Sequence, residues 1–342
     1  MRKLLNVLFV TLAEAKVCLE SENVCVKKDD EVLLRVPLLN LEQIVMFNYY
    51  GATPQLLGEC SKRKISISFL SEFGKYLGTF HGESSGNVLL RREQYRIADD
   101  NRALRYAKNF IFGKLYNQKW VIERGIRDYS LRIDSEFLKK QSEFISEQLK
   151  QILVIDNEEH LRAAEGNAAH HYFSTLDELI LQNKDFFAFL NRNRRPPTDA
   201  VNAMLSFAYT LLSNECRHAL EVVGLDSYVG FFHADRPGRA SLALDLMEEL
   251  RPHFADRFVL SLINRNEVDE RDFEVQSSGA VYLCEKSRKK FLSSWQNRKK
   301  DEIMHPFLKE KVEWGLVPYC QALLLVRTIR GDLDNYPPFL WK

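Results

Sequence analysis

The sequence predicts an α+β protein, with a small, sandwich-like β-rich domain at the N-terminus and a larger all-α domain after it. Two observations carry this prediction. Residues 7–81 contain short apolar runs with β-branched residues, which are typical of strands. From about residue 89 onward, apolar residues recur at the spacing of amphipathic helices. The turn formers of 82–87 (GESSGN) separate the two patterns, so we expect domains at 1–88 and 89–342.

The first domain is expected to combine short strands with one helix. We place the strands at 7–12, 16–19, 24–27, 31–37, 43–47, 65–69 and 75–81. The helix covers 53–63, because Thr53 is a favoured N-cap and Pro54 fits the first helical position. The result is a small sandwich or a strongly twisted sheet that carries one helix.

The second domain is expected to be a series of amphipathic helices. We place them at 91–120, 135–155, 157–173, 198–223, 241–250 and 301–330. The helix at 198–223 follows Pro196 and Pro197, with Thr198 as its N-cap, and Gly224 ends it. A basic loop at 191–197 (NRNRRPP) interrupts the series.

Composition excludes several classes of protein. The 342 residues carry 48 basic and 47 acidic side chains, a net charge of +1, which excludes a uniformly basic nucleic-acid binder but allows local basic patches. The six cysteines are scattered without a CxxC pair, which indicates a reduced cytoplasmic protein rather than a zinc ribbon or a disulfide framework. The apolar start is interpreted as a strand, and no run approaches the roughly 20 apolar residues of a membrane span.

The stretch 231–250 (FFHADRPGRASLALDLMEEL) has the strongest chemical character. On its predicted helix, Asp245, Glu248 and Glu249 fall within one arc, opposite the apolar residues. Together with His233, two such carboxylates suit Mn²⁺ or Mg²⁺. An acidic arc is more often a solvated face, and the geometry does not choose among the three acids.

Arginines adjoin this stretch. Arg236 and Arg239 lie in its Pro/Gly loop, where guanidinium groups suit a phosphate-bearing substrate. Further basic tracts occur at 191–195, 286–290 and 298–300, and they add Arg194, Arg195, Lys289 and Lys290 as candidate phosphate contacts. Phe291 and Trp295 separate the last two tracts, which suits a base-stacking surface, although solvated charge is the commoner explanation for any one tract.

Two helices carry polar residues whose role the spacing leaves open. Glu165 stands among alanines and a glycine, where it either faces solvent or lies in a tight crevice. The 198–223 helix has a stripe of neutral hydrogen-bonding residues and one arginine, which either lines a wet cleft or faces solvent. The stripe consists of Asn202, Ser206, Tyr209, Ser213 and Arg217.

Seven segments, taken in order, resemble the CRISPR-associated integrase family, the universal Cas endonucleases of spacer acquisition. They are RVPLLNLEQIVMFNYYGAT, ISISFLSEFGKYLGTFHG, SGNVLLRREQY, AAEGNAAHHYF, RRPPTDAVNAMLSFAYTLL, GFFHADRPGRASLALDLMEELRP and YPPFLWK. The resemblance runs from about residue 4 to the C-terminus. The last segment, with the overall length, is similar to the type I, subtype C branch.

The resemblance implies a β-rich domain that builds a homodimer and a helical domain that holds one divalent metal, Mg²⁺ or Mn²⁺. By the family motifs, the ligands are Glu165, His233 and Glu248. Asp245 matches a second acid near the metal, which leaves Glu249 as a surface residue. Asn202 and Tyr209 match a helix beside the cleft, and we include them among the residues that contact DNA.

The resemblance also implies partners and an activity. Two homodimers hold a small ferredoxin-fold Cas partner dimer, and this hetero-hexamer acts on double-stranded DNA with 3′ ends and on CRISPR repeat DNA. The expected reaction is attack of a DNA 3′-OH on a phosphodiester, in the cytoplasm of a prokaryote. The alternatives are a non-catalytic DNA-binding architectural or adaptor protein, which has no need of a Glu–His–Glu set, and a phosphohydrolase of small nucleotides, for which no base pocket is evident.

Overall fold

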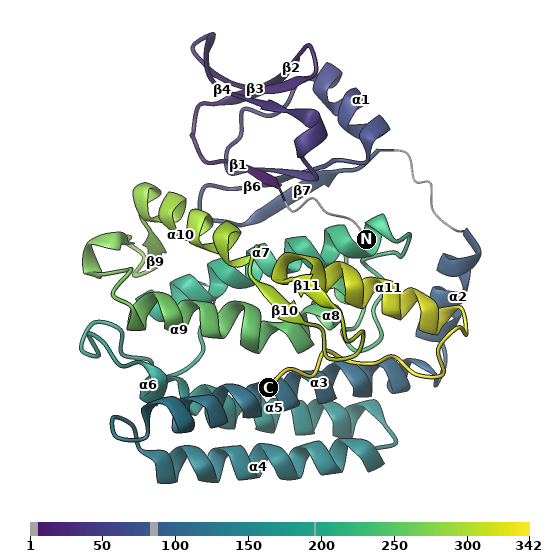
Figure 1. Ribbon diagram of the computed structural model, residues 1–342, viewed down its shortest axis with the longest axis vertical. Coiled ribbons are helices and arrows are strands. Elements are labelled where there is room, and N and C mark those ends of the chain that lie inside the picture. Colours follow the sequence, from purple (N-terminus) through teal and green to yellow (C-terminus); the bar gives the residue numbers. More distant parts are fainter. Residues whose placement is uncertain (1–5, 83–87, 195) are drawn as a thin grey trace. The chain divides into compact units, whose positions relative to one another are not determined.

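A computed structural model describes residues 6–82, 88–194 and 196–342 (Figure 1). These residues form two compact units. The first contains 6–82 together with Glu285–Ile303 and Val312–Leu316, and the second contains the other described residues. The strand-rich first unit and the mostly helical second unit confirm the predicted fold class. Two stretches from the C-terminal third belong to the first unit, which a single boundary at residue 88 did not anticipate.

Two sheets form the first unit. The four-stranded sheet has the order β1 (Val7–Val10), β5 (Gln43–Met46), β6 (Ser66–Leu70) and β7 (Tyr76–Phe80). β1, β5 and β6 are parallel, whereas β7 is antiparallel to β6. The second sheet is an antiparallel meander of β2 (Lys16–Glu20), β3 (Asn23–Lys28) and β4 (Glu31–Pro37). Each predicted strand is found to within two residues at either end.

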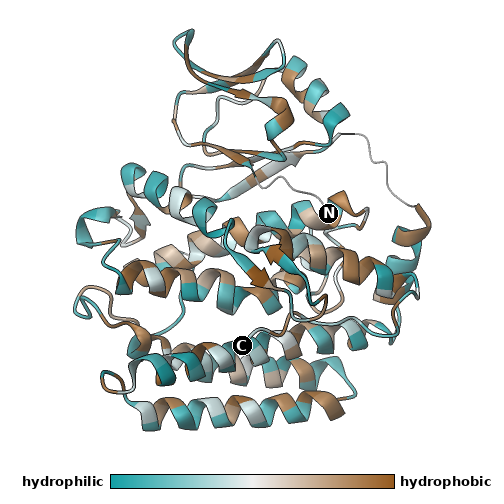
Figure 2. Cartoon of the chain, viewed as in Figure 1, coloured by the Kyte–Doolittle hydropathy of each residue, from teal (hydrophilic) through white to brown (hydrophobic). Residues whose placement is uncertain are grey.

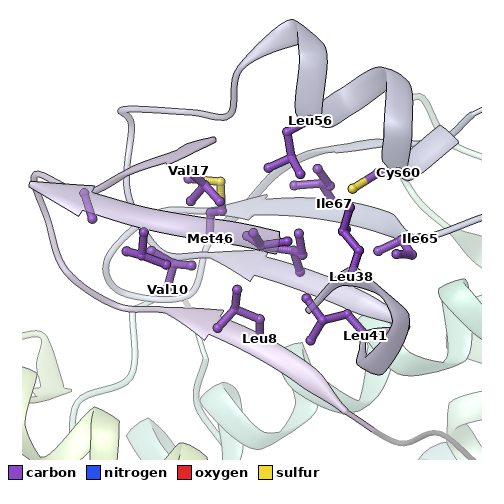
Figure 3. Packing of buried hydrophobic residues seen from close by; sticks show 14 residues of the cluster. Leu8, Val10, Val17, Leu38, Leu41, Met46, Leu56, Cys60, Ile65 and Ile67 are labelled. Atoms are coloured by element: carbon purple, nitrogen blue, oxygen red, sulfur yellow. The ribbon is translucent and has the colours of Figure 1, made fainter. Parts of the chain in front are cut away.

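Helix α1 (Pro54–Arg63) connects the parallel strands β5 and β6. Its N-cap is the predicted Thr53, whose hydroxyl accepts a hydrogen bond from the Leu56 N–H at 3.4 Å. Leu56 and Cys60 face inward and join strand residues such as Ile67 in the apolar cluster of Figure 3. Burial of each large apolar side chain stabilises the unit by about 1.5–3 kcal/mol.

The helices of the second unit carry both hydrophobic and hydrophilic residues along their length (Figure 2). They are α2 (Val88–Ala98), α3 (Ala103–Tyr129), α4 (Ser135–Val154), α5 (Glu158–Ser174), α6 (Leu176–Leu179), α7 (Ala200–Val222), α8 (Ser241–Arg251), α9 (Arg257–Asn264) and α11 (Val317–Ile329). A π-helical turn, Pro252–Asp256, links α8 to α9. α10 (Glu285–Arg298) belongs to the first unit.

Three predicted helices differ from the structure. The helix at 91–120 is divided into α2 and α3, because the Asp100 carboxylate accepts the Arg102 N–H at 2.7 Å and so forms a turn. The predicted 301–330 helix contains a hairpin, β10 (Glu302–Met304) and β11 (Lys311–Glu313), before α11 begins. Pro306 lies between these strands and cannot donate to a helix. Asp199, rather than Thr198, caps α7.

One further hairpin, β8 (Phe273–Val275) and β9 (Val281–Leu283), also lies in the domain that we predicted to be all-α. In the part of the chain that the structure describes, no helix is long and apolar enough to cross a membrane.

Helix α3 packs closely against α8. A Cβ atom at Gly113 of α3 would lie 2.8 Å from the Cβ of Glu249 on α8, which is closer than real Cβ contacts allow. Only glycine therefore permits this approach, and it brings the next residue, Lys114, to the acidic side chains of α8.

Candidate active site

Side chains from three helices and one loop meet in the second unit. Lys114 of α3 forms ion pairs with Glu165 of α5 and with Glu248 of α8; its Nζ lies 2.8 Å from Glu248 Oε2. His233, in the loop before α8, has its Nε2 3.7 Å from Glu248 Oε1. The structure thus brings together the three residues predicted to be ligands. It adds Lys114, which sequence reasoning missed.

Asp245 positions His233. The Asp245 carboxylate accepts hydrogen bonds from the backbone N–H groups of Phe231 (2.6 Å), Phe232 (3.0 Å) and His233 (2.9 Å). Its Oδ1 also lies 2.6 Å from Nδ1 of the His233 ring. With the proton on Nδ1, the ring donates to Asp245 and carries its lone pair on Nε2, toward Glu248. Asp245 is fully buried, and both of its carboxylate oxygens accept hydrogen bonds from the His233 loop. It therefore orients His233 and has no oxygen left to bind a metal ion.

The electrostatics around Glu248 favour its charged form. Its side chain is 4% exposed and forms ion pairs with Lys114 and with Arg251, which lies one turn further along α8. Burial alone would raise the pKa of Glu248, but the charges of Arg251 and Lys114 outweigh it and lower the pKa to about 2. Burial likewise opposes the charge of Lys114, whose pKa is nevertheless raised by Glu248 and Glu165.

A buried network supports Arg251. Asp256, in the π-helical turn, accepts hydrogen bonds from the hydroxyl groups of Tyr172 (2.9 Å) and Tyr209 (2.6 Å). The guanidinium of Arg251 lies 4.9 Å from the ring centre of Tyr209, and that of Arg192 lies 5.2 Å from it. Tyr209 was predicted to contact DNA. Its hydroxyl instead binds Asp256 and its ring packs against Arg251, so it acts on the site through Arg251.

Four arginines adjoin the His233 loop. Burial lowers the pKa of Arg239, and the charges of Arg236, Arg162 and Arg194 act in the same direction, whereas the charge of Asp245 opposes them. Arg236 and Arg194 are exposed. The Arg162 guanidinium lies 4.7 Å from the Phe232 ring centre and donates a hydrogen bond to the Phe232 carbonyl. Such a cluster has the charge and the donors to bind phosphate groups.

Another candidate DNA contact, Asn202, is fully buried in the structure. It bonds to Asp199 at 2.6 Å and to the Asn191 carbonyl at 2.8 Å, so its side chain is engaged within the protein instead of facing a cleft. Arg217, at the end of the same stripe, is also buried. Arg195 lies outside the described residues.

The basic helix α10 belongs to the first unit and not to the unit that holds the site. Lys289 and Lys290 are exposed there, and Lys289 pairs with Glu285 at 2.8 Å. Phe291 and Trp295 are buried, at 2% and 3% exposure, so they pack the interior and are not available to stack on bases.

Glu249 was predicted to be a surface residue, and this prediction is wrong. The residue is fully buried, and its carboxylate accepts hydrogen bonds from the Tyr336 hydroxyl, from Gln321 Nε2 (2.9 Å) and from the Phe339 N–H (2.8 Å). Burial raises the pKa of Glu249 to about 7. Glu249 thus fastens the C-terminal tail to α8, directly behind Glu248.

The donor types fit Mg²⁺ or Mn²⁺, but they are not assembled as ligands. Within residues 6–82, 88–194 and 196–342, no three His, Cys, Asp or Glu side chains are placed to hold one ion. At this site the Lys114 ammonium lies between the two carboxylates. Two features fit an ion: the Nε2 of His233 is available, and the buried Glu248 Oε2 makes no well-directed hydrogen bond, although Lys114 is 2.8 Å away. An ion therefore fits once Lys114 shifts.

Solved structures share this fold. The structure matches a casposase bound to integration product with a TM-score of 0.85 at 22% identity, over 98% of this chain and 94% of that chain. It matches a Cas1 protein from Thermotoga maritima with a TM-score of 0.80 at 20% identity, over 95% and 97% of the two chains. By fold, the protein therefore groups with the casposase and Cas1 structures.

Sequence comparison specifies the family. The family model described as CRISPR associated protein Cas1 matches residues 8–297. The chain is 43% identical to CRISPR-associated endonuclease Cas1 1 of Chlorobaculum tepidum and 44% identical to CRISPR-associated endonuclease Cas1 2 of Rhodospirillum rubrum, in both cases over the full length of the two proteins. The chain belongs to the Cas1 family, which confirms the resemblance found in its motifs.

Proposed function

We propose that this protein is a divalent-metal-dependent DNA endonuclease and integrase that inserts short DNA duplexes into a CRISPR array. The observation that carries the proposal is the convergence of Glu165, His233 and Glu248 beside a cluster of arginines. Membership of the Cas1 family supports it, since the curated relatives are named endonucleases and a structure of the same fold is a casposase with its integration product.

In the proposed reaction a DNA 3′-OH attacks a phosphodiester at the edge of a repeat. Glu165, Glu248 and the Nε2 of His233 would hold Mg²⁺ or Mn²⁺, which supplies activation of the hydroxyl and neutralises charge in the transition state. A hydrogen bond from Nδ1 of His233 to Asp245 would leave the Nε2 lone pair for the ion. Arg251 fixes the Glu248 carboxylate, so the site is organised before DNA arrives.

Arg236 and Arg239 would bind non-bridging oxygens of the DNA backbone, and Arg194 would extend this contact. Contacts to phosphate suffice, because phosphate carries no sequence information and captured DNA varies in sequence. Lys289 and Lys290 offer further backbone contacts from the first unit.

The proposal includes partners. We infer that the first unit builds a homodimer, and its exposed apolar side chains on β4, Leu33 and Leu34, support this. Two homodimers with a small ferredoxin-fold Cas partner dimer would form the hetero-hexamer, and one structure of the same fold is described as a Cas6-RT-Cas1--Cas2 complex. We also propose the type I, subtype C branch and the cytoplasm of a prokaryote as its setting.

The proposed activity is tested with three substrates in the presence of Mn²⁺. We expect the protein to cleave branched DNA and to join a short duplex with free 3′-OH ends to repeat DNA, and we expect EDTA to stop both reactions. Mononucleotides should remain intact. DNA binding without any turnover would favour the adaptor alternative, and hydrolysis of mononucleotides alone would favour a small-molecule phosphohydrolase.

DNA binding by this protein is expected to depend steeply on salt, although its net charge is only +1. Each phosphate contact contributes a slope of about −0.9 to the logarithm of affinity against the logarithm of salt concentration. Arg236→Ala and Arg239→Ala should each reduce the magnitude of that slope by about 1, as titrations of a labelled duplex would show. Lys119→Ala on α3 is a matched control that should leave the slope unchanged. A flat salt dependence in the wild type would show that the arginines are only solvated.

A further inference from the structure

Lys114 is a buried cation between two of the proposed metal ligands. The residue is 3% exposed. Its ammonium contacts Glu165 Oε1 and lies 2.8 Å from Glu248 Oε2. Lys114 follows Gly113, the residue at which α3 approaches α8 closely enough to exclude a Cβ atom. The position of this charge is therefore set by helix packing.

The two carboxylates that contact Lys114 are paired with cations of the protein itself. Glu165 and Glu248 contribute two negative charges, and Lys114 and Arg251 contribute two positive charges that pair with them. Without Lys114, two carboxylates would face each other in a largely buried place, where each would lack compensation. With Lys114, a divalent ion would have to enter beside an ammonium that already uses the same oxygens.

We propose that Lys114 acts as an internal cation that holds Glu165 and Glu248 together in the metal-free protein and weakens the binding of divalent ions until DNA is bound. A DNA phosphate brings negative charge to the site and so offsets the repulsion between Lys114 and the ion. Lys114 is thus a positioning residue that makes metal binding depend on DNA. The inference rests on the metal dependence of the proposed function.

The test compares Mn²⁺ binding and thermal unfolding in Lys114→Met and in the wild-type protein. Methionine keeps much of the side-chain length and removes the charge. We expect the metal-free variant to melt at a lower temperature, to bind Mn²⁺ at least about tenfold more tightly, and to gain more thermal stability from Mn²⁺ than the wild type. Free Mn²⁺ is counted by electron paramagnetic resonance, so no turnover is needed. A short duplex should tighten Mn²⁺ binding to the wild type more than to the variant.

Two further variants make the result decisive. Lys119→Met, on the same helix but away from the carboxylates, should match the wild type in Mn²⁺ affinity. Lys114→Gln keeps a hydrogen-bond donor without the charge, and it replaces Lys114→Met if the latter does not fold. Weaker Mn²⁺ binding by a folded Lys114 variant would overturn the inference while leaving metal dependence intact. Absence of Mn²⁺ binding in every protein, with and without DNA, would overturn the metal dependence and the inference together.

Discussion

Replacement of Glu165 by glutamine is expected to lower DNA cleavage and integration by more than the roughly 10–100-fold that follows loss of a group that only orients a ligand. The amide has nearly the shape of the carboxylate and can still accept a hydrogen bond from Lys114, but it lacks the charge that would hold the metal. The Glu165 side chain is 22% exposed, so the change creates no core cavity. Reaction rates at saturating Mn²⁺ measure the loss of activity, and the melting temperature measures any loss of stability.

Glu159→Gln is the matched control for this variant. Glu159 lies on the same helix, α5, and is exposed, so its replacement should change neither activity nor stability. Glu165→Gln should unfold within a few degrees of the wild type, since Lys114 keeps Glu248 as a partner. Wild-type turnover in a folded Glu165→Gln protein would contradict the assignment of Glu165 as a ligand.

The local parts of the fold were predictable because their signals are local. Alternating residues and turn formers placed each strand of the first unit, and Thr53 with Pro54 placed α1. The parallel pairing of β1, β5 and β6 was not predicted, because it joins segments that are distant in the sequence. The break between α2 and α3 depends on one side-chain bond of Asp100, which competes with the helix in a way that periodicity does not reveal.

In the candidate site, too, local sequence signals were predictive and contacts between distant residues were not. The motifs identified Glu165, His233 and Glu248, which the structure brings together. Lys114 was missed because nothing near it in the sequence is acidic, and its partner Glu165 is 51 residues away. Arg251 had a weak signal, since it lies three residues after Glu248 on a helix.

The acids of α8 show why helical periodicity was insufficient. An amphipathic pattern assumes that one face of a helix meets solvent. α8 instead contacts α3, α7 and α11, and Asp245, Glu248 and Glu249 are all buried. Each acid therefore has a different internal partner: the His233 loop for Asp245, the cations for Glu248 and the C-terminal tail for Glu249. Their common arc on the helix does not give them a common function.

Glu249→Ala is accordingly expected to destabilise the protein strongly, rather than to be neutral as its predicted surface position implied. The change leaves the Tyr336 hydroxyl and the Phe339 N–H without their acceptor in a buried place, whereas the Gln321 amide keeps the Tyr336 oxygen and the Pro337 carbonyl. An unsatisfied buried donor costs about 1–3 kcal/mol, so we expect a loss of roughly 3–5 kcal/mol in the free energy of unfolding. The C-terminal tail should loosen first, which hydrogen exchange at Phe339 and Trp341 would detect.

The comparison with Glu249→Gln and Glu147→Ala separates this role from a general effect of losing an acid. Glutamine retains one carbonyl oxygen, so it should keep part of the hydrogen bonding and lose less stability than alanine. Glu147 is exposed on α4, and its replacement should leave the melting temperature nearly unchanged. Activity of Glu249→Ala should fall only as far as its folded fraction does, because the carboxylate binds the C-terminal tail. If the variant were as stable as the wild type and yet inactive, the result would contradict our assignment. Glu249, rather than Glu248, would then be the acid of α8 that activity requires.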